Sequence, residues 1–205
     1  MKIKICGITN IEDALLCEKS GADSLGFVFY KKSRRYISPE DAGRITNALS
    51  AFTTRVGVFV NESPEEINQI VNLAGVNLAQ IYTLENKYDL AKICYPVINA
   101  FRIKAFFNYS ALNRFRDNYL LLDSYSKTGF GGTGKKFDWS KIPLDLRDKI
   151  ILAGGISEND LEEIFEFVSP FSIDVSSSLE MAPGKKDSEK VKSFFDKFNR
   201  LRFLC

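Results

Sequence analysis

Short apolar and β-branched runs recur along the chain at intervals of roughly 20 to 30 residues. Each run has the length of one strand and is mostly apolar on both faces, as in a parallel sheet that is covered on both sides. The pattern therefore predicts eight parallel strands. They occupy residues 2–8, 24–30, 55–60, 78–82, 97–104, 119–124, 149–154 and 171–177.

The segments between these runs have helical periodicity and begin with helix start signals. At 38–40 and 63–65 the chain reads Ser-Pro-Glu, which places a proline in the first turn after a serine N-cap. Ser157 opens another predicted helix, with acidic residues in its first turn. After Asp187, an apolar stripe at helical spacing indicates a helix packed on the sheet rather than a surface for a partner. The stripe consists of Val191, Phe194, Phe195, Phe198 and Leu201.

A strand followed by a helix, repeated along the whole chain, predicts an α/β fold with right-handed crossovers. Eight such units close into a (β/α)8 TIM barrel. We expect residues 1–205 to form this barrel as a single catalytic domain, because no linker or low-complexity tract interrupts them. A doubly wound open sheet is the alternative, but residues 7–10 after the first strand lack the glycine-rich dinucleotide fingerprint.

The charge balance argues against a polyanionic partner. The chain has 28 basic and 26 acidic residues, and its formal net charge of +2 does not indicate nucleic-acid binding. No apolar stretch approaches the roughly 20 residues needed to span a bilayer, and the first residues do not resemble a signal peptide. We therefore expect a cytoplasmic protein that acts on a small molecule and binds neither nucleic acid nor membrane.

The cysteines and the absence of histidine limit the chemistry. Cys6, Cys17, Cys94 and Cys205 lack the paired spacing of a zinc or redox site and suit a reducing compartment. A chain without histidine has no Ser/His or Cys/His dyad and no histidine ligand for a metal. Carboxylates, thiols, lysines or backbone dipoles must perform any catalysis, and we expect neither a metal nor a cofactor.

Active sites of such barrels lie at the carboxyl ends of the strands. Cys6 ends the first strand and Asp123 the sixth, so a thiol and a carboxyl group would face each other across the barrel and supply a base and an acid. A cysteine in an apolar strand is more often an inert small hydrophobe. An aspartate that ends an apolar run, in contrast, must be paired or lie at a polar rim. Gln80 and Asp174 end two further strands at the same rim.

Two features at this rim suit a phosphorylated ligand. Gly154 and Gly155 follow the seventh strand, and Ser176 and Ser177 follow the eighth, where barrels often bind phosphate through backbone amides and hydroxyls. The alternative is a plain glycine turn with serines that cap a helix. One of the two arginines after the second strand, Arg34 or Arg35, is suited to a bidentate pair with a substrate carboxylate, the alternative being a solvated basic loop.

The long segment 124–136 follows the sixth strand and contains four glycines. Such a loop is typical of a lid or a binding loop, and a flexible connection without function is the alternative.

Several motifs resemble phosphoribosylanthranilate isomerase. The resemblance begins with KICGITN at 4–10, GADSLGFVFY at 21–30 and SRRYISPEDA at 33–42. It continues in order almost to the end of the chain, and the opening motif and the GGTGKKFDW segment are the parts most specific to this family. The further matching segments are 55–67, 120–124, 131–139, 152–156, 174–180 and 183–187.

The resemblance implies a cofactor-free isomerase of tryptophan biosynthesis that performs an Amadori rearrangement of N-(5-phosphoribosyl)anthranilate. It implies that Asp123 protonates the ribose ring oxygen as general acid and that Cys6 removes the C2 proton as general base. Arg35 would hold the anthranilate carboxylate, with Asp174 and Gln80 in the same substrate site. The phosphate would bind at Gly154, Gly155, Ser176 and Ser177.

The chain departs from the family pattern at two positions. Tyr82 stands where the family usually has histidine, and Ser178 replaces a glycine after the eighth strand. Two alternatives remain open: another sugar-phosphate barrel isomerase, including one that also accepts a second aminoaldose, and a phosphate-binding relative with altered activity. The sequence does not distinguish a monomer from a homodimer.

Overall fold

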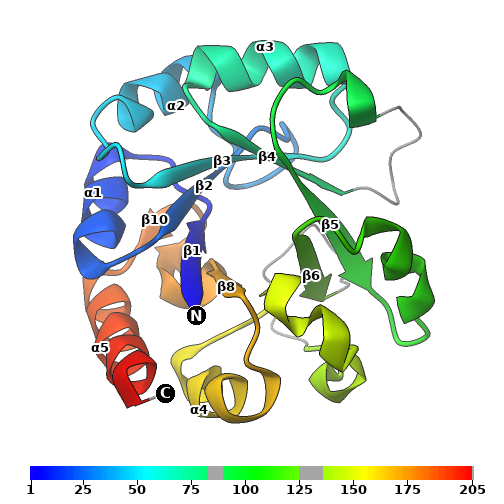
Figure 1. Cartoon of the computed structure of the whole chain (residues 1–205). Helices are drawn as coiled ribbons and strands as arrows, with labels where there is room; N and C mark the ends of the chain where they lie inside the picture. The colour runs from blue at the N-terminus through cyan, green and yellow to red at the C-terminus, as the bar shows by residue number, and fades with distance from the viewer. Residues whose placement is uncertain (83–89, 125–135, 205) are drawn as a thin grey trace.

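The computed structural model describes residues 1–82, 90–124 and 136–204. Eight parallel strands pair in sequence order, and β8 pairs with β1, so that the sheet closes into a barrel (Figure 1). The predicted (β/α)8 architecture is confirmed. The strands are β1 (Lys2–Cys6), β2 (Ser24–Val28), β3 (Thr54–Phe59), β4 (Leu78–Tyr82), β5 (Val97–Ile103), β6 (Leu120–Ser124), β7 (Ile150–Leu152) and β8 (Ser172–Val175).

The predicted serine caps are confirmed. Ser38 accepts a hydrogen bond from the backbone N–H of Asp41 at the start of α2 (Pro39–Thr46). Ser63 forms a full capping box with Glu66 at the start of α3 (Pro64–Ala74). These contacts satisfy backbone donors that have no partner within the helix, which explains why each helix begins where its Ser-Pro-Glu motif stands.

The longer helices of the outer layer come from the first half of the chain and from its end. Figure 1 shows α1 (Ile11–Ser20), α2, α3 and α5 (Ser188–Leu204) around the outside of the barrel. The described connections after β4 to β6 contain only short 3-10 turns, and the helix predicted from Ser157 is three consecutive short pieces. The turns are η1 (Leu90–Lys92), η2 (Tyr109–Phe115), η3 (Trp139–Lys141) and η4 (Leu144–Lys149), and the pieces are η5 (Glu158–Asp160), α4 (Leu161–Glu163) and η6 (Ile164–Val168).

A small hairpin follows β8 and was not predicted. After the turn η7 (Ser177–Leu179), strands β9 (Glu180–Ala182) and β10 (Lys185–Lys186) pair antiparallel. The Pro-Gly dipeptide at 183–184 is a turn signal from which this reversal could have been predicted. Gly184 has φ +81°, a conformation that side chains disfavour. The hairpin brings two polar side chains, Glu180 and Lys186, under the carboxyl rim.

Side chains alternate between two apolar layers along the strands. Ile3 and Ile5 of β1 belong to the layer between the sheet and the helices. Val56 and Val58 belong to a second cluster, and Cys6 packs against this cluster. The period of two along a strand therefore directs Cys6, and Lys4 two residues before it, toward the barrel interior.

The apolar stripe predicted on the last helix forms part of the outer layer. Phe194 and Phe198 of α5 are at most 1% exposed, and the Phe198 ring lies 5.4 Å from that of Phe165. None of the helices in residues 1–82, 90–124 and 136–204 combines the length and the apolar composition that crossing a membrane requires.

Replacing Phe198 with alanine will lower the free energy of unfolding by about 3–5 kcal/mol, because the change leaves a cavity in the layer between helix and sheet. Urea denaturation followed by circular dichroism measures this loss. Phe203→Ala on the same helix is the matched control, since the Phe203 side chain is 87% exposed. A loss for the Phe203 variant that equals the loss for the Phe198 variant would contradict the packing described here.

Candidate active site

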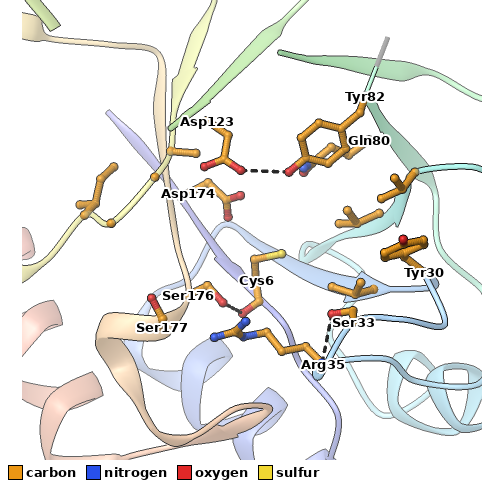
Figure 2. Close-up of a pocket in the computed structure, with 17 residues that line it drawn as sticks. Cys6, Tyr30, Ser33, Arg35, Gln80, Tyr82, Asp123, Asp174, Ser176 and Ser177 are labelled. Atoms are coloured by element: carbon orange, nitrogen blue, oxygen red, sulfur yellow. Dashed lines mark hydrogen bonds between the residues drawn. The ribbon is translucent and has the colours of Figure 1, made fainter. Parts of the chain in front are cut away.

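One cavity opens at the carboxyl ends of the strands and collects the residues singled out in the sequence (Figure 2). Its lining comes from β1, β2, β3, β4, β6 and β8 and from the segments after β2, β3, β7 and β8. The nine predicted site residues all line it: Cys6, Arg35, Gln80, Asp123, Gly154, Gly155, Asp174, Ser176 and Ser177.

Cys6 is held through its backbone at the end of β1. Its carbonyl oxygen accepts hydrogen bonds from the Ser176 hydroxyl at 3.0 Å and from the Lys186 ammonium at 2.8 Å. Burial raises the pKa of the Cys6 thiol, and the positive charge of Lys4 opposes that rise. The backbone of Cys6 is therefore fixed in place, and the charges around its thiol act on its protonation.

Asp123 lies on β6, with its carboxyl group directed into the same cavity (Figure 2). The Tyr82 hydroxyl donates a hydrogen bond to Asp123 Oδ2 at 3.0 Å, and both side chains are buried. Burial raises the pKa of Asp123 to about 6, helped by the negative charge of Asp174, whereas the Tyr82 hydrogen bond lowers it. A carboxyl group with this pKa can donate a proton near neutral pH.

Asp174 is paired with a lysine that sequence reasoning missed. Both of its carboxylate oxygens accept hydrogen bonds from Lys4 Nζ at 2.9 Å, and the Lys4 side chain is 2% exposed. Burial raises the pKa of Asp174, and the charge of Lys4 opposes that shift. The signal in the sequence was the spacing, because Lys4 precedes Cys6 by two residues and must point to the same side of the strand.

Arg35 reaches the cavity but is already paired along one edge. Its Nε and Nη2 donate to Glu180 of the hairpin at 2.8 and 2.6 Å. Gly7, with φ +81°, makes room for it, since a Cβ at Gly7 would lie 2.5 Å from Arg35 Cδ. Glu180 also binds Lys186 at 3.1 Å. The pairing orients the guanidinium and leaves its Nη1 end for a ligand. Glu180 and Lys186 were not among the predicted site residues.

Gln80 offers an unused acceptor. Its side chain is 2% exposed, and its Oε1 has no hydrogen-bond partner among the described residues. A buried amide oxygen without a partner costs free energy, so a polar ligand that donates to it would recover that loss. This observation supports the expectation that Gln80 contacts substrate.

The glycines and serines predicted to bind phosphate lie together on one side of the cavity. Gly154 and Gly155 have φ +95° and +73°, so both need glycine, and a Cβ at Gly154 would lie 2.3 Å from Ser124 Oγ. Ser177 lines the cavity beside them. The Ser176 hydroxyl donates its hydrogen bond to the Cys6 carbonyl, so Ser176 would bind an anion chiefly through its backbone N–H.

Both departures from the family pattern have structural roles here. Tyr82 binds the carboxyl group of Asp123, and the Ser178 hydroxyl donates to the carbonyl of Ile156 at 2.6 Å. Ser178 therefore ties the loop after β8 to the loop after β7. The segment proposed as a lid falls mostly at 125–135 and lies outside the described residues. Among residues 1–82, 90–124 and 136–204, no acidic or sulfur-bearing cluster could hold a metal ion.

The fold and this rim define a (β/α)8-barrel in which a thiol and two buried carboxyl groups line one cavity together with glycines and serines of the last two rim loops. Residues 3–197 match the family model described as N-(5'-phosphoribosyl)anthranilate (PRA) isomerase. The chain belongs to this family, a family of isomerases.

Relatives and solved structures agree with this assignment over nearly the whole chain. The N-(5'-phosphoribosyl)anthranilate isomerase of Trichlorobacter lovleyi is 43% identical over 95% of this chain and 96% of its own. The crystal structure of phosphoribosyl anthranilate isomerase from Thermotoga maritima is 40% identical with a TM-score of 0.86, covering 98% of this chain and 99% of that one. A phosphoribosyl anthranilate isomerase solved in complex with reduced 1-(o-carboxyphenylamino)-1-deoxyribulose 5-phosphate is 39% identical with a TM-score of 0.82, covering 98% of this chain and 99% of that one.

Replacing Tyr82 with phenylalanine will raise the pKa of Asp123 above its value of about 6, because the change removes a hydrogen bond to the charged carboxylate. NMR titration of carbon-13-labelled aspartate, assigned with Asp123→Asn, measures this pKa. Tyr30→Phe alters another tyrosine of the same cavity and should leave the titration of Asp123 where it is. An unshifted Asp123 in the Tyr82 variant would show that the hydrogen bond does not tune the acid.

Proposed function

We propose that this chain catalyses the Amadori rearrangement of N-(5-phosphoribosyl)anthranilate to 1-(2-carboxyphenylamino)-1-deoxyribulose 5-phosphate in tryptophan biosynthesis. The reaction is an aldose-ketose isomerisation that needs only acid/base groups, without metal or cofactor. The observation that carries the proposal is that Cys6 and Asp123, from strands three positions apart around the closed barrel, line one cavity with the glycine-serine rim.

The chemistry divides between these two groups. The protonated carboxyl group of Asp123 donates its proton to the ribose ring oxygen while the bond between that oxygen and C1 breaks, leaving a protonated Schiff base. The Cys6 thiolate then removes the proton from C2, and the electrons of that C–H bond neutralise the iminium nitrogen to form an enolamine. Tautomerisation of the enolamine gives the ketone. The Tyr82 hydroxyl stabilises the Asp123 carboxylate after its proton has left.

The remaining predicted residues hold the substrate. Arg35, oriented by Glu180, binds the anthranilate carboxylate through its remaining donors. The Oε1 of Gln80, which has no partner among the described residues, accepts a hydrogen bond from the sugar, and Asp174 lines the cavity while Lys4 holds it from behind. The phosphate binds at Gly154, Gly155, Ser176 and Ser177.

A second sugar-phosphate isomerisation is supported by one observation. Asp123 and Asp174 line the same cavity, and an aspartate pair is an alternative acid/base set for an aminoaldose. The ion pair with Lys4 weighs against it, because Asp174 is engaged by an ammonium group on both oxygens.

We further propose that the whole chain acts as one catalytic domain on a small phosphorylated substrate, as a monomer or a homodimer. A cytoplasmic location is supported by the free thiols of Cys6, Cys17 and Cys94, which suit a reducing compartment.

Cys6→Ser and Asp123→Asn will each lower kcat by about 10²-fold or more, as the loss of a general base or acid does. The decay of anthranilate fluorescence in phosphoribosylanthranilate measures turnover. Cys94→Ser and Asp117→Asn make the same exchanges at exposed positions and should retain full activity. Turnover by the wild-type chain that survives either catalytic exchange would remove the role assigned to that residue. The absence of turnover by the wild-type chain would refute the proposed function.

Ser177→Glu will raise KM at least about tenfold with a smaller effect on kcat, because a carboxylate at this rim repels the substrate phosphate. Steady-state kinetics with the same fluorescence assay separate the two constants. Ser110→Glu introduces the same charge on the exposed surface of η2 and should leave KM unchanged. A Ser177 variant with the KM of the wild type would place the phosphate elsewhere.

A further inference from the structure

Lys4 is a buried cation to which the proposed chemistry assigns no proton transfer. It lies on β1 with 2% of its side chain exposed, and its ammonium group donates to both oxygens of Asp174 on β8. Strand register places the two residues side by side, since Lys4 pairs with Asp174 across the seam where the barrel closes. Burying an ammonium group costs free energy unless groups of opposite charge lie close to it.

The neighbouring glycine shows that this charge lies against the sulfur of Cys6. Gly26 of β2 pairs with Cys6 in register. A Cβ at Gly26 would lie 2.9 Å from Cys6 Sγ, 3.0 Å from Lys4 Nζ and 3.1 Å from Lys4 Cε. The sulfur and the ammonium nitrogen therefore share the space that the missing side chain leaves. Only glycine at this position lets both groups pack against β2 without displacement.

Charged and titratable groups of both signs face Cys6 from five elements. Lys4, Lys186 and Arg35 favour the thiolate, whereas Asp174 and a deprotonated Tyr82 would oppose it. Lys186 binds the Cys6 carbonyl and Arg35 is paired with Glu180, so Lys4 is the cation placed beside the sulfur itself. The positioned groups are Lys4 (β1), Arg35 (loop after β2), Tyr82 (β4), Asp174 (β8) and Lys186 (β10).

We propose that Lys4 is a positioning residue whose ammonium group stabilises the thiolate of Cys6. Asp174 holds the ammonium group in place, and its negative charge reduces this stabilisation. The inference deepens the proposed function, because it rests on Cys6 as the general base. It assigns to Lys4 the activating charge that the thiol in the cavity wall requires, since loss of water around the sulfur disfavours the thiolate.

The two partners of the ion pair should therefore act on Cys6 in opposite directions. Lys4→Met removes the cation that favours the thiolate, so the pKa of Cys6 rises. Asp174→Asn removes the anion that opposes the thiolate and leaves the ammonium group for the sulfur, so the pKa of Cys6 falls. If the ion pair had only a structural role, the two substitutions would not shift the pKa of Cys6 in opposite directions.

The pH dependence of iodoacetamide alkylation, resolved residue by residue by mass spectrometry, reads out the ionisation of Cys6 without substrate. We expect the midpoint for Cys6 to move up by at least about one pH unit in Lys4→Met, which is about tenfold less thiolate at a given lower pH. The midpoint should move down in Asp174→Asn. Cys94, which is exposed, is the internal control and should keep its midpoint in every variant.

Circular dichroism establishes whether each variant is folded. If the single Lys4 variant does not fold because Asp174 is left without a counter-ion, Asp174→Asn decides the question alone. A folded Lys4→Met with the wild-type midpoint would overturn the proposal. A midpoint in Asp174→Asn that stays or rises would also overturn it.

The same variants separate this inference from the proposed function. If the wild-type chain does not turn over phosphoribosylanthranilate while the two midpoints shift as expected, the function fails and the role of Lys4 stands. If turnover is present and the midpoints do not shift, the function stands and the role of Lys4 fails. In an active enzyme, Lys4→Met should lower kcat more than it changes KM, because Lys4 does not line the substrate cavity.

Discussion

The pairing of β8 with β1 closes the barrel, and the candidate site depends on the register of that pairing. Lys4 lies opposite Asp174 in this register, which brings an ammonium group and a carboxylate from the two ends of the chain into one buried pair. A shift of one residue would turn Lys4 and Cys6 toward the helices and remove them from the cavity. Closure therefore determines both the fold and the electrostatic surroundings of the thiol.

The hairpin after β8 extends this arrangement into a second network of charges. Glu180 receives Arg35 on one side and Lys186 on the other, and Lys186 in turn binds the backbone carbonyl of Cys6. The guanidinium proposed to hold a carboxylate and the thiol proposed as base are therefore joined through two buried side chains. Such a connected set limits movement, since displacing one member leaves another buried charge without its partner.

Tyr82 shows how a departure from a family pattern can be accommodated. A phenol has a hydroxyl donor in place of an imidazole, and here it reaches the carboxyl group of Asp123. The hydrogen bond opposes the effect of burial, which leaves Asp123 with a pKa of about 6. The acid thus remains close to the range in which it can both lose and regain a proton. Ser178 likewise has a defined role, as a tie between the last two rim loops.

The sequence alone determined the eight strands, the helix caps and nine of the residues that line the cavity, because apolar periodicity, capping motifs and the carboxyl-end rule depend on local order along the chain. Only the tertiary structure decided which groups pair with the buried charged side chains of the site. Lys4, Glu180 and Lys186 are of residue types usually found at the surface, and although strand spacing places Lys4 on the same side as Cys6, nothing along the chain indicates which groups neutralise these three charges. Their roles come from residues about 145 to 180 positions away that closure brings within hydrogen-bond distance. The free energy of a buried charge depends on such partners, which local sequence does not encode.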